Sequence, residues 1–83
     1  MAFFVYILHS ESKGGKSYAG LTSDVDHRLH EHNLGKSKFT SGYVPWKVVL
    51  VETFNTREEA RVREKYFKTA SGRRLIKKLT AYQ

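Results

Sequence analysis

The segment FFVYILHSESKGGKSYAGL, residues 3–21, contains two extended runs separated by a loop. Residues 3–9 are rich in β-branched and aromatic side chains, and residues 17–21 form a second short extended run. A Gly-Gly pair at positions 14 and 15 lies between them. Two such runs around a glycine-containing loop are typical of an antiparallel hairpin. We therefore expect two paired strands in this part of the chain.

Two tyrosines of this hairpin are candidates for a functional site. Because side chains alternate between the faces of a strand, Tyr6 is expected on one face of the first strand, and Tyr18 and Gly20 share a face of the second. The pairing can bring the two phenols side by side, and Gly20 has no side chain to obstruct a ligand above the sheet. The alternative is that both tyrosines are ordinary amphipathic sheet residues.

A helix is predicted over residues 25–33. Thr22, Ser23 and Asp24 offer side-chain oxygens that can cap its N-terminus. Gly35 stands where a left-handed residue commonly ends a helix.

A second helix is predicted from residue 57 to about residue 70. Thr56 and Glu59 have the spacing of a capping box, in which the hydroxyl and the carboxylate each accept from a backbone N–H. Ser71 is expected to cap a last short helix that ends at Leu79, with its apolar side chains inward and its cations in solvent.

An apolar third strand, expected over residues 47–54, completes the order ββαβαα. This order predicts an α+β fold, in which helices flank a small, mostly antiparallel three-stranded sheet. With 83 residues, the chain has room for one domain, which we place over residues 1–83.

Composition narrows the function classes. Fifteen Lys and Arg against eight Asp and Glu give a net charge of +7, which favours a polyanionic partner. The chain has no cysteine, which excludes disulfides and thiolate metal sites and is compatible with the cytoplasm. Its first apolar run ends at His9, far short of the roughly 20 residues of a membrane span, so we expect no membrane contact.

Arg28 and His32 are a second candidate pair. They lie four residues apart on the first predicted helix, so a guanidinium and an imidazole can act at the same point. The alternatives are a solvated arginine and a histidine that the helix dipole stabilises near the C-terminus. The histidines form no recognisable zinc array, and none is assigned to a metal.

Glu64 is the candidate metal ligand. Ala60, Glu64 and Phe67 follow at i, i+4 and i+7 on the second predicted helix, so the carboxylate occupies a row that should face the sheet. One carboxylate, completed by waters and substrate phosphate, suits Mg²⁺. The alternative is a surface ion pair between Glu64 and Lys68 at i+4.

Five elements in this order resemble the GIY-YIG nuclease family over essentially the whole chain: VYI at 5–7, YAG at 18–20, Arg28, His32 and Glu64. The chain is similar to the short single-domain bacterial members that are related to the N-terminal domain of the excision-repair nuclease subunit. It departs from the name motifs at two positions, with Val5 in place of glycine and Ala19 in place of isoleucine, but both tyrosines and Gly20 are present.

The resemblance implies hydrolysis of DNA phosphodiester bonds with Mg²⁺ or Mn²⁺, in DNA repair or processing. It assigns catalysis to Tyr6, Tyr18, Arg28, His32 and Glu64, with the metal on Glu64. Our mechanistic hypothesis makes Tyr6 the general base, helped by His32, because a free phenol with a pKa of about 10 is a poor base at neutral pH. The roles of the two tyrosines can also be exchanged.

The expected partner is DNA, bound over the tyrosine face. Besides Gly20, the expected substrate contacts are the cations Lys36, Lys38 and Lys68, with Arg61 and Arg73 as further candidates. We expect a monomer or a weak homodimer.

A rival hypothesis is a non-catalytic nucleic-acid-binding module with a degenerate GIY-YIG site. Many family members have an asparagine after the metal-binding glutamate, and this chain has no asparagine beyond Asn55. A purely structural or protein-interaction domain would make the five site residues a coincidence.

Overall fold

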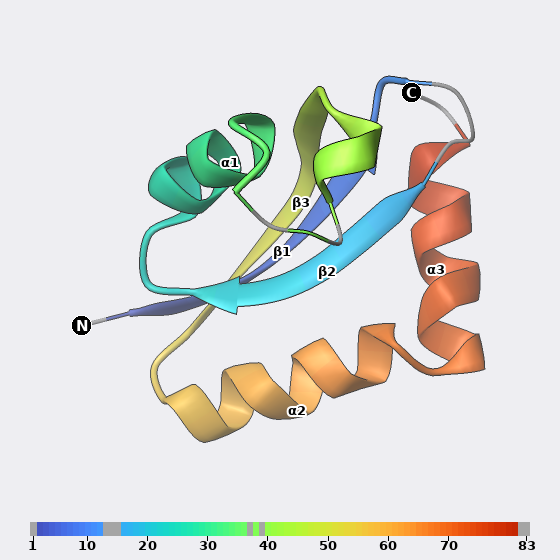
Figure 1. Ribbon diagram of the computed structural model, residues 1–83. Coiled ribbons are helices and arrows are strands. Elements are labelled where there is room, and N and C mark those ends of the chain that lie inside the picture. Colours follow the sequence, from blue (N-terminus) through green and yellow to red (C-terminus); the bar gives the residue numbers. More distant parts are fainter. Residues whose placement is uncertain (1, 13–15, 37, 39, 82–83) are drawn as a thin grey trace.

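Strand β1 (Phe3–Ser10) is the centre of a three-stranded sheet. The computed structural model describes residues 2–12, 16–36, 38 and 40–81. Both neighbours of β1 run antiparallel to it, in the order β2-β1-β3 (Figure 1). The other elements are β2 (Ser17–Thr22), α1 (Val25–Asn33), a 3-10 turn (Ser41–Tyr43), β3 (Trp46–Phe54), α2 (Arg57–Phe67) and α3 (Ala70–Thr80). The predicted α+β class and the order ββαβαα are confirmed.

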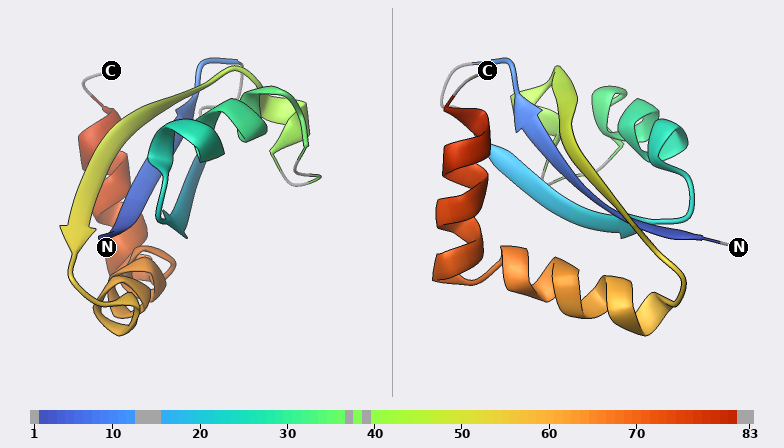
Figure 2. Two further views of the ribbon diagram at one scale, coloured as in Figure 1. Left: turned by 90° about the vertical axis from the view of Figure 1, so that its left-hand side faces the viewer. Right: turned by 180° about the vertical axis from the view of Figure 1, so that it is seen from behind.

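The sheet separates two hydrophobic layers. On one face, α2 and α3 pack Ala60, Phe67 and Ile76 against Val5 and Ile7 of β1. On the other face, α1 covers the layer that contains the second core cluster, formed by Tyr6, Leu8 and Trp46 with Val25 and Leu29 packed against it (Figure 2). Because both faces of β1 are covered, its apolar run from residue 5 to residue 8 is continuous, at most 1% of each residue being exposed.

The predicted start and end of α1 are confirmed. Asp24 is the N-cap, and its carboxylate accepts a hydrogen bond from the backbone N–H of His27 at 3.1 Å. Gly35 has a φ of +77°, the left-handed conformation that follows many helices. The predicted Gly-Gly hairpin loop lies outside the described residues.

The capping box of α2 is confirmed in its first half. The hydroxyl oxygen of Thr56 accepts from the backbone N–H of Glu59 at 3.2 Å. The carboxylate of Glu59 accepts from the Thr56 hydroxyl at 3.0 Å, which differs from the backbone contact that the motif predicted.

The predicted boundary between the last two helices is wrong. α2 ends at Phe67, and the N-cap of α3 is Thr69 in place of Ser71. The Thr69 hydroxyl donates to the carbonyl of Tyr66 and accepts from the backbone N–H of Gly72, which links the end of one helix to the start of the next. The chain can bend this sharply because Gly72 has no Cβ. A Cβ at this position would clash with the backbone of Tyr66.

Candidate active site

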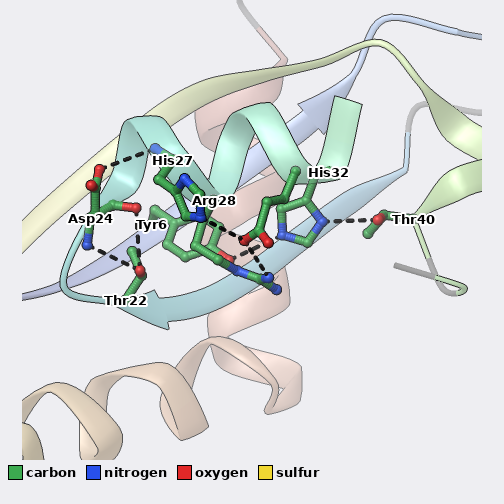
Figure 3. Close-up of polar contacts among 8 residues, drawn as sticks. Tyr6, Thr22, Asp24, His27, Arg28, His32 and Thr40 are labelled. Carbon is green, nitrogen blue, oxygen red and sulfur yellow. Dashed lines mark hydrogen bonds and ion pairs between the residues drawn. The ribbon is translucent and has the colours of Figure 1, made fainter. Parts of the chain in front are cut away.

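A buried hydrogen-bonded chain crosses the space between the sheet and α1. The hydroxyl of Tyr6 lies 3.2 Å from Nε2 of His32, and Nδ1 of the same ring lies 2.8 Å from Oγ1 of Thr40 (Figure 3). All three residues are at most 1% exposed. Both imidazole nitrogens therefore have fixed partners, which sets the orientation of the ring.

Two neighbours hold the Tyr6 phenol in place. Gly20 is its direct partner on β2, and a Cβ at position 20 would clash with the phenol hydroxyl and ring. The space expected to leave room for a ligand above Gly20 is thus occupied by Tyr6. Tyr18 is half-buried beside it, with its ring centroid 6.3 Å from that of Tyr6 and 5.0 Å from that of His32. The predicted pairing of the two phenols is present in the structure.

Arg28 points toward the same group from α1 (Figure 3). A hydrogen bond with Tyr6 raises the pKa of the guanidinium, and an Arg28 nitrogen also lies 3.1 Å from the Glu31 carboxylate. The arginine side chain is 36% exposed, so one member of the group carries a permanent positive charge toward solvent. Such a planar donor can bind phosphate oxygens in a bidentate manner.

Burial fixes the protonation states of Tyr6 and His32. It raises the pKa of the Tyr6 phenol above its usual value of 10.0, although the hydrogen bond from Arg28 acts in the opposite direction. It lowers the pKa of His32 below 6.5, and the positive charge of Arg28 lowers it further. Near neutral pH the pair is therefore a protonated phenol next to a neutral imidazole.

Glu64 approaches from α2, on the other face of the sheet. Its row is the expected one, since Ala60 and Phe67 are at most 1% exposed, and the Glu64 side chain itself is 20% exposed. Its carboxylate lies 3.4 Å from the ammonium group of Lys68, as in the ion pair considered from the sequence. Its negative charge is also one of the causes that raise the pKa of Tyr6, so the two groups interact electrostatically.

The expected substrate cations Lys36, Lys38 and Lys68 lie at the surface. Lys36 and Lys38 are exposed in the segment after α1, and Lys68 is exposed at the end of α2. Their exposure leaves them accessible to an anion, but the structure brings none of them into the buried hydrogen-bonded chain.

Two residues of the site were not found from the sequence. Thr40 lies in a loop without periodicity, so no pattern indicated that its hydroxyl would meet His32. Asn33 holds the end of α1 against β3: its amide oxygen accepts from the Trp46 N–H at 2.6 Å, and its amide nitrogen donates to the Trp46 carbonyl. A polar residue at a helix end before a basic loop gives only a weak signal for such a link.

The donor set fits a metal that needs few protein ligands. Within the part of the chain that the structure describes, no group of three His, Cys, Asp or Glu side chains could hold an ion. A cation at Glu64 would complete its coordination with waters and substrate oxygens. This arrangement suits Mg²⁺, which usually keeps several waters.

The fold agrees with the comparison to protein families. Residues 2–79 match the model of the GIY-YIG catalytic domain. The chain therefore belongs to the GIY-YIG family, a nuclease-type family whose substrate is DNA.

The chain is similar to proteins that carry the name UPF0213. One from Streptococcus agalactiae is 41% identical over 66 residues, covering 78% of this chain and 73% of the relative. The UPF0213 protein BH0048 from Halalkalibacterium halodurans is 44% identical over 61 residues, covering 72% of this chain and 63% of the relative. A solution NMR structure of the UPF0213 protein BH0048 from Bacillus halodurans matches with a TM-score of 0.56 and 35% identity, over 96% of this chain and 86% of that one.

In the described segments, helices α1, α2 and α3 have 9, 11 and 11 residues. None of them is both long and apolar enough to cross a bilayer.

Proposed function

We propose that the chain is a divalent-metal-dependent endonuclease that hydrolyses DNA phosphodiester bonds at the group formed by Tyr6, Tyr18, Arg28 and His32, together with Glu64. The observation that carries the proposal is the buried contact between the Tyr6 hydroxyl and Nε2 of His32, with the Arg28 guanidinium beside it. A phenol, an imidazole and a guanidinium are the groups needed to move a proton next to a phosphate.

The proton transfer begins from the resting state of the pair. Tyr6 is a phenol and His32 is neutral, so the phenol proton can move to Nε2. As water attacks phosphorus, the water proton passes to the Tyr6 oxygen and the Tyr6 proton passes to His32. The bond from phosphorus to the leaving oxygen breaks, and the alkoxide takes a proton from solvent. The imidazolium then returns its proton to solvent through Tyr6.

The partly exposed residues receive the substrate. Arg28 and Tyr18 are accessible, whereas Tyr6 is only 1% exposed, so the phosphate approaches along the first two. Arg28 binds the phosphate oxygens, and Tyr18 donates a hydrogen bond to the phosphate or to the attacking water. The charge of the phosphate also offsets that of Arg28, which makes His32 a better proton acceptor.

Glu64 is the proposed ligand of Mg²⁺ or Mn²⁺. When bound, such an ion supplies charge neutralisation at the non-bridging and leaving oxygens. The ammonium of Lys68 now neutralises this carboxylate, so the metal and the lysine compete for it. If the metal takes Glu64, Lys68 would be released from its ion pair and could contact the substrate, as expected from the sequence.

The test is cleavage of supercoiled plasmid and branched DNA with and without Mg²⁺ or Mn²⁺. We expect metal-dependent nicking by the wild type, no turnover by Glu64→Ala, and DNA affinity retained in both. Glu58→Ala is the matched control, because this exposed carboxylate lies on the same helix in its first turn. Wild-type turnover in Glu64→Ala would reject the metal assignment.

The second candidate function is a nucleic-acid-binding module without turnover. The ion pair of Glu64 with Lys68 favours it, because an engaged carboxylate is a poorer metal ligand. A mobility shift of DNA without cleavage, under every metal condition, would establish this function in place of the nuclease.

A further inference from the structure

A groove of about 700 Å³ runs along the outer edge of β2. β2 is an edge strand of the sheet, and α3 lies beside it (Figure 1). The end of α2, Lys68 and α3 line the groove opposite β2. Its apolar floor contains Ala19, Phe67 and Ile76. The volume is in the range of about 300–1,000 Å³ that ligand sites in proteins occupy.

Among the residues that the structure describes, four cations and no carboxylate line the groove. These cations are Lys16, Lys68, Arg73 and Lys77. Lys68 is paired with Glu64, whereas within the described segments no carboxylate lies at ion-pair distance from the other three. Like charges gathered around one groove repel one another, and an anion bound between them would relieve that repulsion.

The cations of α3 are placed by the helical period. Arg73, Ile76, Lys77 and Thr80 follow at i, i+3, i+4 and i+7, so they share one face, and all four line the groove. Arg73 and Lys77 are stacked one turn apart along its wall. Arg74 and Lys78 are each one position further, so they point about 100° away and do not line the groove.

The groove and the candidate active site share Tyr18. This residue lines the groove, and its ring centroid lies 5.0 Å from that of His32. A chain of repeated negative charges could therefore occupy the groove and the site beside Arg28 at the same time. A small anion would engage only part of the row of cations.

We propose that this groove is a second binding site for the phosphodiester backbone of the nucleic-acid substrate, which it leads past Tyr18 to the reacting phosphate. The proposal deepens the proposed function and rests on it for the identity of the polyanion. The contacts are charge to charge, so they supply affinity and direction without base recognition.

The test compares two double variants that change net charge equally. Arg73→Gln/Lys77→Gln removes two cations from the groove, and Arg74→Gln/Lys78→Gln removes two from the outer face of the same helix. Each lowers the formal net charge from +7 by two, to +5. The probes are a labelled thymidine oligonucleotide, alone and as its duplex, and inorganic phosphate as competitor. Affinity is measured without divalent metal at several salt concentrations.

The groove variant is expected to bind about 20-fold more weakly at 0.1 M salt. The slope of log affinity against log salt, which is negative, should decrease in magnitude by about 1.4 to 1.8 for two lost contacts. The outer-face variant should lose several times less. If the groove variant loses affinity for the single strand alone, the site binds unpaired DNA. If it loses affinity for both probes, the site binds the backbone of either form. Competition by inorganic phosphate at concentrations comparable with the oligonucleotide would overturn the polymer assignment.

Equal losses in the two double variants would overturn the groove and leave only diffuse charge attraction. Because binding is measured without metal, this outcome is independent of cleavage. Selective loss in the groove variant of a protein that never cleaves DNA would retain the groove and reject the nuclease.

Discussion

The hydroxyl of Thr40 can serve either tautomer of His32, because it can accept from Nδ1–H or donate to Nδ1. If the phenol of Tyr6 donates to Nε2, then Nδ1 is protonated and donates to Thr40 at 2.8 Å. In the other tautomer, Thr40 donates to Nδ1, and Nε2 donates to the Tyr6 oxygen. Only the first tautomer lets His32 accept the phenol proton. The proposed mechanism therefore requires Thr40 as a hydrogen-bond acceptor that positions the ring.

The first prediction concerns Thr40→Val, which replaces the hydroxyl by a methyl group of similar size. It leaves Nδ1 of a buried ring without its partner, at a cost of about 1–3 kcal/mol in the free energy of unfolding. We expect the ¹⁵N chemical shifts of His32 to change from those of the Nδ1-protonated tautomer to those of a mixture, and the cleavage rate to fall. Thr40→Ser should restore both, because it returns the hydroxyl.

A purely structural role of Thr40 predicts something different. In that case Thr40→Val and Thr40→Ser would differ in stability, but the tautomer of His32 would be the same in both and in the wild type. That result would remove Thr40 from the proposed proton path.

For the individual residues of the candidate site, the sequence predicted positions only where the periodicity of a strand or helix applies. The strand alternation correctly brought Tyr6 and Tyr18 together, and the helical spacing correctly brought Arg28 and His32 to one side. Thr40 could not be found in this way, because its position follows from a loop whose path depends on tertiary contacts. One of these is the hydrogen bond from the Trp46 indole N–H to the Thr40 carbonyl at 2.9 Å.

At the scale of the elements, the turn between α2 and α3 shows what local signals leave undecided. Thr69 and Ser71 both have the hydroxyl of an N-cap. Ser71 was the wrong choice because the cap is decided by the backbone contact between the helices. That contact requires Gly72 at the third helical position, where no Cβ meets the carbonyl of Tyr66. The starts of α1 and α2 were predicted correctly, although Thr22, Ser23 and Asp24 all offered a cap for α1.

The second prediction is that Thr69→Ala destabilises the protein by about 0.5–2 kcal/mol, the usual cost of losing an N-cap. For a domain of this size, that cost corresponds to a decrease in Tm of roughly 4–8 °C per kcal/mol. Thermal unfolding followed by circular dichroism measures it. The matched control is Ser71→Ala, two residues further along the same helix.

The control should change the Tm very little, because the Ser71 hydroxyl accepts only an exposed hydrogen bond from Arg74 at 3.2 Å. A larger decrease for Ser71→Ala than for Thr69→Ala would show that Ser71 caps the helix after all.

At the scale of the whole molecule, β1 couples the site to the core. Val5 and Ile7 belong to the layer with α2 and α3, whereas Tyr6 faces α1 and the buried histidine. Alternation along one central strand therefore places the candidate site directly behind the main core. Because Tyr6 and His32 are both buried and uncharged near neutral pH, the stability of the whole fold is linked to their titration.

The third prediction is a pH window of maximum stability bounded by these two groups. Burial lowers the pKa of folded His32 below the value of 6.5 that applies when the chain is unfolded, so the unfolded chain binds an additional proton as pH falls below 6.5. Stability is therefore complete above 6.5 and decreases toward lower pH. Burial raises the pKa of folded Tyr6 above 10.0, so its contribution is complete below 10.0 and is lost as pH rises.

Urea unfolding at pH 5.5, 8 and 10.5 measures this window, and we expect the largest free energy of unfolding at pH 8. In His30→Gln the decrease at low pH should remain, because His30 is exposed. In His32→Gln that decrease should become smaller. Should His32→Gln fail to fold, an NMR titration of His32 in the wild type decides the question. A midpoint at or above 6.5 would contradict the prediction, since a histidine that binds its proton as readily when folded as when unfolded cannot make folding sensitive to acid.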